Sequence, residues 1–398
     1  MRALLLEAIH PDAATSLHAA GATVDLRPGA LGEPDLVVAL DGVALLGIRS
    51  GTRVTRSVLE QAPDLVAIGA FCIGTNQIDL AAAAERGVAV FNAPFSNTRS
   101  VVELAIAEMI ALTRRLTEKD DALHAGVWDK SAKGAHEMRG RTLGIVGYGN
   151  IGSQLSVLAE ALGMRVVFYD THDKLALGNA RRCESLAELL EVAHVVSLHV
   201  DGRTGNAGLF GEEQFAAMRE RSVVLNLSRG FVVDYAALAA HVRSGHVSGA
   251  AVDVVPVEPK AQGDSFESEL RGLPNVILTP HVGGSTEEAQ HDIGQFVSGK
   301  LRDYIGEGAT TLSVNLPQTT LDARPGTHRL AHLHANTPGV LAKVNGVLAD
   351  HDVNVEAQVL ATLGNHGYLL TDVLTDYAPD VVQVLTDMPE TVRLRVLS

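Results

Sequence analysis

Short apolar runs alternate with longer amphipathic stretches over the first part of the chain. Each run is long enough for one buried strand, and the stretches between the runs have helical spacing. Strands that alternate with helices are typical of a parallel sheet, so an α/β domain is predicted here. The predicted strands are 2–8, 36–40, 44–50, 65–70 and 88–92.

A second series of the same kind runs from about residue 98 to residue 284. Its strands are predicted at 166–170, 195–200, 223–228 and 249–255. Each strand leads into a loop with a candidate site residue, and ligands of open α/β sheets bind beyond the carboxyl ends of the strands. The apolar helix predicted before this series contains Glu103 and Glu108, which are costly in lipid, so no membrane association is expected.

The rest of the chain predicts a return to the first domain and then a third domain. The helix expected at 285–308 cannot simply extend the second sheet, and a polar stretch follows it. The final pattern is βαββαβ, which is ferredoxin-like. The predicted fold class is therefore α/β, with two doubly wound parallel-sheet domains and a small C-terminal domain. The predicted domains are 1–97 with 285–315, then 98–284, a linker at 316–325, and 326–398.

A glycine-rich element follows a further apolar, β-type run that begins at Thr142. Gly147, Gly149 and Gly152 form a G-x-G-x-x-G pattern between a strand and a helix, and Asp170 ends the next strand. Such glycines permit a tight turn, close approach of a pyrophosphate and tight helix packing, and the phosphates would sit on the helix N-terminus. A carboxylate accepts hydrogen bonds from ribose hydroxyls and repels a 2′-phosphate, so NAD is predicted rather than NADP.

Three further fragments propose a catalytic site of Arg229, Glu258 and His281. They are NLSRG at 226–230, DVVPVEP at 253–259 and TPHVGGS at 279–285. An arginine can hold a carboxylate through two parallel hydrogen bonds, a histidine can exchange a hydroxyl proton, and a glutamate can support the charged imidazole. This chemistry suits hydride transfer between NAD and a 2-hydroxy acid.

Charge and cysteine content narrow the possible partners. The sequence has 32 Lys and Arg residues and 47 Asp and Glu residues, a net charge of −15, which disfavours nucleic acid and anionic membranes as partners. Cys72 and Cys183 are its only cysteines, so no disulfide framework is implied and a cytoplasmic location is the default expectation. No metal site is predicted.

Taken together, these motifs resemble the shorter bacterial members of the D-2-hydroxyacid dehydrogenase family that carry a C-terminal ACT regulatory domain. The resemblance covers essentially the whole chain. Its specific stretches are GAFCIGTNQIDL (69–80), FNAPFSNTRSVVELA (91–105), LGIVGYGNIG (143–152), NLSRG (226–230), VDVVPVEP (252–259), LTPHVGGST (278–286) and LHANTPGVL (333–341).

The resemblance implies NAD-dependent oxidation of 3-phospho-D-glycerate to 3-phosphohydroxypyruvate, the first committed step of L-serine synthesis. Reduction of 2-oxoglutarate is a candidate side reaction. Arg229 is implied to orient the substrate, His281 to act as acid and base, and Glu258 to raise the pKa of the histidine. Besides the glycines and Asp170, the residues implied to line the cofactor are Asn150, Ile151, Leu227, Ser228, Asp253, Gly283 and Gly284.

Recognition of the substrate phosphate is where the sequence departs from the family. The implied substrate residues are Arg49, Ser50, Asn97 and Lys130, of which the lysine is implied to reach the site of an adjacent subunit. The family's loop commonly reads Arg-Ser-Arg-Thr, but this chain has Gly51 where the second arginine is expected. One cation is therefore absent or relocated, which puts affinity and substrate identity in question.

The C-terminal domain is implied to bind L-serine as an allosteric effector between two subunits, through His334, Asn336 and Asn354. Two amides and an imidazole can satisfy the carboxylate, amine and hydroxyl of a small amino acid. The residues alone leave another interpretation open: Asn336 could cap the following helix, and His334 could face solvent on its strand. Binding across a subunit boundary implies a symmetric homo-oligomer, expected to be a homotetramer.

Two alternative functions remain at this point. The chain could be a dehydrogenase of the same fold that acts on another D-2-hydroxy acid, which the glycine at position 51 would favour. It could also be a non-catalytic NAD-sensing scaffold, which the intact Arg229, Glu258 and His281 set disfavours.

Overall fold

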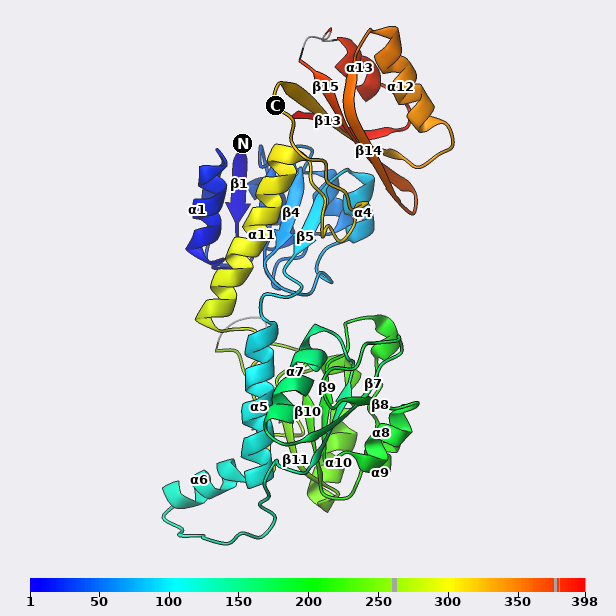
Figure 1. Ribbon diagram of the computed structural model, residues 1–398. Helices are drawn as coiled ribbons and strands as arrows, with labels where there is room; N and C mark the ends of the chain where they lie inside the picture. Colours follow the sequence, from blue (N-terminus) through cyan, green and yellow to red (C-terminus); the bar gives the residue numbers. More distant parts are fainter. Residues whose placement is uncertain (260–262, 376–377, 379, 398) are drawn as a thin grey trace. The chain divides into compact units, whose positions relative to one another are not determined.

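The computed structural model describes residues 1–259, 263–375, 378 and 380–397, which form two compact units (Figure 1). The first unit consists of Met1–Ser96 and Gln290–Ser398, and the second of Asn97–Ala289. The chain therefore passes from one unit to the other at residues 96–97 and 289–290, compared with 97–98 and 284–285 in the division made from sequence.

The first unit contains a five-stranded parallel sheet in the order β2-β1-β3-β4-β5. Leucine, isoleucine and alanine side chains of the central strands are fully buried on both faces, which is typical of a parallel sheet covered by helices. The strands are β1 (Arg2–Leu5), β2 (Thr23–Leu26), β3 (Leu45–Ile48), β4 (Ala67–Ala70) and β5 (Ala89–Asn92). The helices are α1 (Pro11–Ala19), α2 (Glu33–Ala39), α3 (Arg56–Glu60), α4 (Leu80–Glu85) and the long α11 (Glu287–Glu307).

The strand predicted at 36–40 is wrong, because this segment belongs to α2. Glu33, Pro34 and Asp35 form the first turn of that helix, where a proline and acidic side chains are favoured. In this sheet the strand that the sequence analysis missed is β2, whose Thr23 and Asp25 are polar and whose position is an edge of the sheet. An edge strand with few buried side chains has a weak apolar signal.

The second unit contains a seven-stranded parallel sheet in the order β12-β11-β10-β9-β6-β7-β8. The strand order reverses between β6 and β9, and crevices at such a reversal are where open α/β sheets bind ligands. The strands are β6 (Thr142–Val146), β7 (Arg165–Tyr169), β8 (Arg181–Arg182), β9 (Val195–Leu198), β10 (Ser222–Asn226), β11 (Val247–Val252) and β12 (Val276–Leu278).

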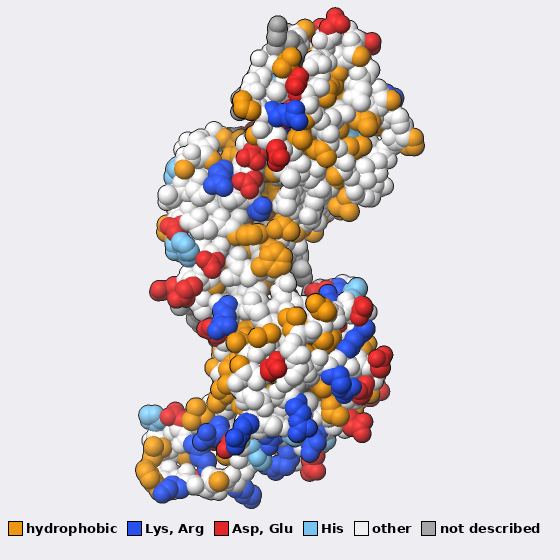
Figure 2. All heavy atoms as spheres, viewed as in Figure 1, with side chains coloured by type: hydrophobic (Ala, Val, Ile, Leu, Met, Phe, Trp, Pro, Cys, Tyr) orange, Lys and Arg blue, Asp and Glu red, His pale blue; other side chains and the backbone are white. Residues whose placement is uncertain are grey.

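Helices cover both faces of this second sheet. Helix α5 packs on one face through Val102, Ala105 and Met109, in a cluster that also holds Ile145 and Leu225 of the sheet. The remaining helices of the unit are α6 (Leu116–His124), α7 (Asn150–Ala161), α8 (Leu186–Val192), α9 (Glu212–Ala217) and α10 (Tyr235–Ser244), with α5 spanning Thr98–Arg114. Side chains of both charge signs are interspersed on the face drawn in Figure 2.

The C-terminal residues form the predicted βαββαβ domain, with an antiparallel sheet in the order β14-β15-β13-β16. One face of the sheet packs against its two helices in a separate core that includes Leu330, Val344 and Leu385. The fold class predicted from sequence is confirmed. The elements are β13 (Thr327–Ala335), α12 (Val340–Asp350), β14 (Val355–Leu363), β15 (His366–Leu374), α13 (Asp380–Thr386) and β16 (Thr391–Leu397).

The other face of this small sheet is joined to the rest of the first unit. Arg393 donates a hydrogen bond to the carbonyl oxygen of Leu65, and the Arg395 guanidinium lies 4.5 Å from the ring centre of Tyr304. The connecting segment is also anchored, since Asn315 exchanges hydrogen bonds with the backbone of Val88 and Val90 beside β5. The stretch interpreted from sequence as a linker, 316–325, is folded against the same sheet, since Leu316 is buried in one core with Phe91 of β5 and Leu321 packs against that core. In the described part of the chain, every helix is too short or too polar to cross a bilayer.

Candidate active site

The candidate site is built around a buried carboxylate at the end of β11. Asp253 is only 2% exposed, and its two oxygens accept hydrogen bonds from the Thr279 hydroxyl at 2.6 Å and from the backbone N–H groups of Val282 and Gly283, both at 2.8 Å. A Cβ atom at Gly283 would lie 2.9 Å from this carboxylate, so a glycine is needed for the approach. Asp253 thereby fixes the loop that carries His281.

His281 itself has a left-handed backbone, with φ of 55°. This conformation is unfavourable for a residue with a side chain, and its N–H donates at 2.7 Å to the carbonyl oxygen of Asp253, which helps to hold it. The imidazole Nδ1 lies 2.8 Å from Oε1 of Glu258. The loop therefore places the histidine and the glutamate in direct contact, and it leaves Nε2 as the nitrogen that can exchange a proton with a ligand.

The contact between these two side chains shifts both pKa values. The hydrogen bond that His281 donates to Glu258, together with the negative charge of that carboxylate, raises the pKa of His281, while burial opposes the rise. The same hydrogen bond lowers the pKa of Glu258, again against the effect of burial. The pair therefore favours a charged imidazole beside a charged carboxylate, so the histidine keeps its proton to a higher pH than an isolated histidine.

Arg229 lies in the same electrostatic environment. Its positive charge lowers the pKa of Glu258 further and partly opposes the rise at His281. The loop after β10 is brought close to the segment leading to Glu258 because residue 230 is a glycine: a Cβ atom there would lie 2.1 Å from the carbonyl oxygen of Val255. The structure therefore brings together the three residues predicted from sequence.

A hydrogen-bond network that was not predicted from sequence links the loop after β10 to the segment after β11. The Asn226 side-chain amide donates to the carbonyl oxygen of Arg229 at 3.1 Å and to the Tyr235 hydroxyl at 3.0 Å. The Tyr235 hydroxyl in turn donates to the carbonyl oxygen of Val254 at 2.6 Å. Burial raises the pKa of Tyr235, which keeps the hydroxyl protonated as a donor. Asn226 opens the NLSRG fragment, so its type was visible in the sequence, but its link through Tyr235 to Val254 was not.

Glu108 is a second buried acid of this region that sequence reasoning placed only as a helix residue. It is 3% exposed in α5, and within the described residues neither of its carboxylate oxygens has a hydrogen-bond partner. Burial, with the nearby charge of Asp253, raises the pKa of Glu108 to about 8. The side chain is therefore largely neutral at pH 7.

The glycine-rich loop forms one wall of a cavity at the sheet's reversal point. A Cβ atom at Gly147 would lie 2.5 Å from the carbonyl oxygen of His199, and one at Gly152 would lie 2.3 Å from the carbonyl oxygen of Gly147. Around Gly149, by contrast, a Cβ atom would meet nothing within 4 Å. Gly147 and Gly152 are therefore needed for packing, whereas Gly149 faces open space in a cavity of about 200 Å³.

Asp170 lines the same cavity, and its carboxylate is already bonded to the loop. It accepts hydrogen bonds from the N–H of Tyr148 at 2.8 Å and from the N–H of His172 at 2.9 Å. Each oxygen retains capacity for a further donor, so binding of ribose hydroxyls fits this geometry. Lys174 and Arg203 also line the cavity, and the Arg203 guanidinium is held by Asp201.

The other residues assigned to the cofactor lie on the same edge of the sheet or its loops. Asn150 and Ile151 start α7, while Leu227 and Ser228 follow β10 and are buried. Gly284 follows Gly283, and a Cβ atom at this position would lie 2.2 Å from the amide nitrogen of Asn97. The residues present therefore fit a dinucleotide: Gly149 would let the phosphates approach, and Asp170 would accept hydrogen bonds from the ribose hydroxyls.

The predicted substrate residues are distributed over different parts of the chain. Asn97 lies beside the His281 loop, through its contact with Gly284. Lys130 lies in the loop beyond α6, past the opposite end of α5, a helix of about 25 Å at 1.5 Å per residue. Within one chain the structure does not bring Lys130 to Asn97. Trp128 in the same loop is 75% exposed, so it does not occupy a core position.

Arg49 and Ser50 follow β3 in the first unit, where the loop backbone is bound by an acid. The Glu7 carboxylate accepts hydrogen bonds from the N–H groups of Gly51 and Thr52, both at 2.8 Å. The Gln77 amide donates to the carbonyl oxygen of Arg49 at 2.6 Å. The loop is thus held through its backbone, and the Gly51 position has no cationic side chain.

The predicted effector residues lie in the C-terminal domain. His334 is 2% exposed on β13, so the solvent-facing alternative is wrong. The His334 ring packs against residue 367, which must be a glycine, because a Cβ atom there would lie 2.3 Å from the ring. Asn336 does not cap α12, whose N-cap is Gly339; its amide donates to the carbonyl oxygen of Gly364 at 3.1 Å. The remaining residue, Asn354, is exposed and donates to Glu356 at 2.7 Å.

These observations define the class of protein: a dehydrogenase of D-2-hydroxy acids with an attached ACT-type domain. Residues 106–283 match the model for the NAD-binding domain of D-isomer specific 2-hydroxyacid dehydrogenases, and residues 330–393 match the model for an ACT domain like that of the AHAS small subunit. The solved structure of D-2-hydroxyisocaproate dehydrogenase superposes with a TM-score of 0.71 at 25% identity, covering 79% of this chain and 100% of that one.

Full-length relatives identify the family more closely. The chain is 48% identical to D-3-phosphoglycerate dehydrogenase of Haemophilus influenzae, over 99% of this chain and 96% of that protein. It is 47% identical to D-3-phosphoglycerate dehydrogenase of Escherichia coli K12, over 99% and 97% of the two chains. The chain belongs to the D-3-phosphoglycerate dehydrogenase family, and its NAD-binding domain and oxidoreductase class, predicted from sequence, are confirmed.

Proposed function

We propose that the protein oxidises 3-phospho-D-glycerate to 3-phosphohydroxypyruvate with NAD, as the first step of L-serine synthesis. Full-length similarity to enzymes of that name supports the substrate. The observation that carries the chemistry is the direct contact between His281 and Glu258, which provides an acid and base beside a charged arginine.

In the proposed reaction, Arg229 binds the substrate carboxylate and so orients C2. Nε2 of His281 accepts the proton of the C2 hydroxyl, and Glu258 stabilises the imidazolium that results. When bound, NAD supplies the hydride acceptor. In the reverse direction His281 returns its proton to the oxygen of the ketone. Asp253 acts through the loop that it binds, as a positioning residue.

Phosphate recognition is assigned to Arg49, Ser50 and Asn97, with Lys130 contributed by an adjacent subunit. The positive charge of Arg49 supports its assignment, because a guanidinium can bind two phosphate oxygens at once. With Gly51 in the loop, one charge-assisted hydrogen bond of roughly 1.5–3 kcal/mol is missing, which corresponds to about one to two decades in affinity. We therefore expect weaker phosphate binding than an arginine at this position would give.

Regulation by L-serine is assigned to the C-terminal domain at His334, Asn336 and Asn354. The exposed amides of the two asparagines, in a domain that matches an ACT model, support this assignment. A homotetramer in the cytoplasm is the assembly that we propose, since binding between two such domains needs at least two copies. Reduction of 2-oxoglutarate is proposed as a side reaction.

The test is steady-state NADH production from 3-phospho-D-glycerate, compared with D-lactate, glycerate and 2-hydroxyglutarate, with and without L-serine. A preference for the phosphorylated acid and a lower rate with L-serine are expected. Equal rates for phosphorylated and unphosphorylated acids would contradict the substrate and would favour a dehydrogenase of another D-2-hydroxy acid.

A further inference from the structure

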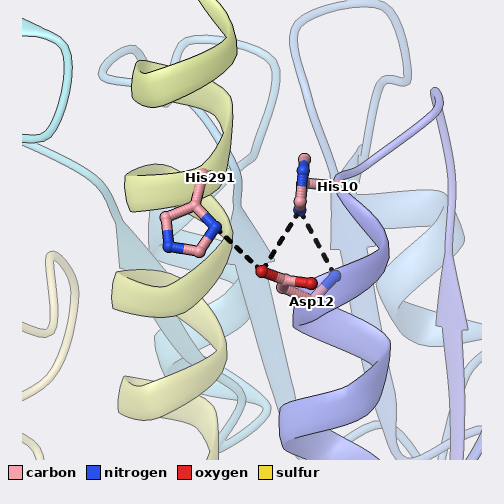
Figure 3. Close-up of side chains that lie close together, drawn as sticks. All are labelled: His10, Asp12 and His291. Carbon is pink, nitrogen blue, oxygen red and sulfur yellow. Dashed lines mark hydrogen bonds and ion pairs between the residues drawn. The ribbon is translucent and has the colours of Figure 1, made fainter.

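A cluster of metal-binding side chains lies in the first unit and takes no part in the proposed reaction. His10 precedes α1, Asp12 lies in the first turn of α1, and His291 lies near the start of α11 (Figure 3). One nitrogen from each imidazole and one carboxylate oxygen all lie within 4.8 Å of one another. Sequence reasoning predicted no metal site, because the residues come from distant parts of the chain.

The three side chains already point toward a common centre. Nδ1 of His291 lies 2.8 Å from Oδ2 of Asp12, and Nδ1 of His10 lies 3.8 Å from the same oxygen. The two imidazole rings meet edge to face, with centres 5.6 Å apart. Ligands of a tetrahedral zinc ion are about 3.4 Å apart, as bond lengths of about 2.0–2.1 Å require. The two spacings of 2.8 Å and 3.8 Å lie on either side of that value, and an ion bound through Nδ1 of His10 would replace the hydrogen bond that this nitrogen now accepts from the N–H of Asp12.

The backbone that carries the cluster is fixed by close packing. Ala13 and Leu17 of α1 belong to the same buried core as Ile293 and Val297 of α11. Gly294, inside α11, allows the approach: a Cβ atom there would lie 3.3 Å from Cβ of His10. A glycine in a helix interior is less favourable than alanine, so its presence at this contact has a packing reason.

We infer that His10, Asp12 and His291 bind one divalent transition-metal ion of the zinc type. Two imidazole nitrogens and one carboxylate oxygen are a ligand set that suits zinc or cobalt, whereas magnesium and calcium prefer oxygen ligands. The side chains are 34%, 38% and 49% exposed, so an ion can enter and keep a water molecule as its fourth ligand. A bound ion would join α1 to α11 and stabilise that contact.

The inference can be tested by isothermal titration of zinc into the full-length, tag-free protein after removal of metals by a chelator. One site per chain is expected, with at least tenfold weaker binding in His291→Ala and in Asp12→Asn. The matched control is His124→Ala, which removes a histidine 3.8 Å from Asp120 where no second histidine completes a cluster in the described structure. Equal zinc binding by His291→Ala and the unaltered protein would overturn the inference.

Two further measurements distinguish binding at this cluster from misfolding and from binding at a cysteine. His10→Asn keeps a side chain that can accept the N-cap hydrogen bond of α1 but removes the imidazole, so it should fold and still lose zinc. Cobalt replaces zinc as a coloured probe: visible absorption without a thiolate charge-transfer band is expected. A strong thiolate band that persists in His291→Ala would place the ion at a cysteine and overturn the inference. Neither measurement depends on enzymatic activity.

Discussion

The loops around Asp253 and the loops of the C-terminal domain hold their polar side chains in different ways. In the first region one buried carboxylate binds three donors of the following loop, and His281 and Glu258 are paired within the chain. In the second region Asn336 and Asn354 are exposed, and each amide donates to one nearby acceptor. The first arrangement is complete within one chain and suits catalysis. The second leaves the two asparagine amides exposed, while His334 on β13 is buried.

Replacement of His281 is the strongest test of the first region. His281→Ala removes the proposed acid and base, so NADH production should fall about 10²- to 10⁴-fold, the range for general acid–base catalysis. Binding of NADH, followed by its fluorescence, should persist, because the glycine-rich loop is untouched. Loss of less than about tenfold would show that the histidine does not exchange the proton.

Glu108 allows a test of how much stability the protein loses when a buried acid near Asp253 must ionise. Its pKa of about 8 lies above the ordinary value of 4.5, so the unfolded chain ionises first and the stability contributed by the neutral side chain is lost as the pH rises from 4.5 through 8. Glu108→Gln stays neutral and should be more stable than the parent by roughly 2–5 kcal/mol at pH 8.5. The melting temperatures of the two proteins should converge toward pH 4.5; a difference independent of pH would contradict this account.

The next prediction concerns the loop at Gly51 in the first unit, where a cation for the substrate phosphate is missing. Gly51→Arg should lower the KM for the phosphorylated substrate about 10- to 100-fold, because it supplies one charge-assisted hydrogen bond. The backbone of Gly51 has no positive φ, but an added Cβ would lie 3.1 Å from Oε2 of Glu7 and 3.2 Å from Cβ of Ala30, so both neighbours must shift by a few tenths of an ångström. Gly306→Arg, on the exposed part of α11, is the matched control for added charge, and an equal effect there would refute specific phosphate binding.

The smallest expected effect concerns the effector positions. Asn336→Ala and Asn354→Ala should each raise the L-serine concentration for half inhibition about tenfold, because each removes a hydrogen bond of roughly 0.5–1.5 kcal/mol or leaves a ligand group unpaired. Asn345→Ala is the control, as this residue lies in the same domain and binds Gln358. Unchanged inhibition in both test variants would place the effector elsewhere.

Local patterns were enough to predict most of the fold and the chemical residues. Gly147 and its neighbours, and the fragments around Arg229 and His281, are short segments whose roles depend on adjacent residues. The strand at 36–40 was predicted wrongly because the apolar run there belongs to helix α2. The true strand, β2, was missed because it lies at an edge of the sheet and has few buried apolar side chains. The capping alternative for Asn336 failed because the chain reaches Gly339 before α12 begins.

Contacts between distant segments could not be predicted in the same way. That Asp253 binds the loop of His281, that Tyr235 reaches Val254, and that Glu108 is buried beside Asp253 depend on tertiary packing. The proposed metal cluster has the same origin, because the two histidines meet only where α1 packs against α11.

The most direct test of the central claim is the pH dependence of kcat/KM for oxidation, compared between the parent protein and Glu258→Gln. Oxidation needs a neutral histidine, so the parent rate should rise with pH through the raised pKa of His281, above the ordinary 6.5. Without the carboxylate the rise should move to lower pH. Glu212→Gln, which removes the partner of His241, should leave the profile unchanged. Identical profiles for the parent and Glu258→Gln would contradict the proposed pairing of His281 with Glu258 in catalysis.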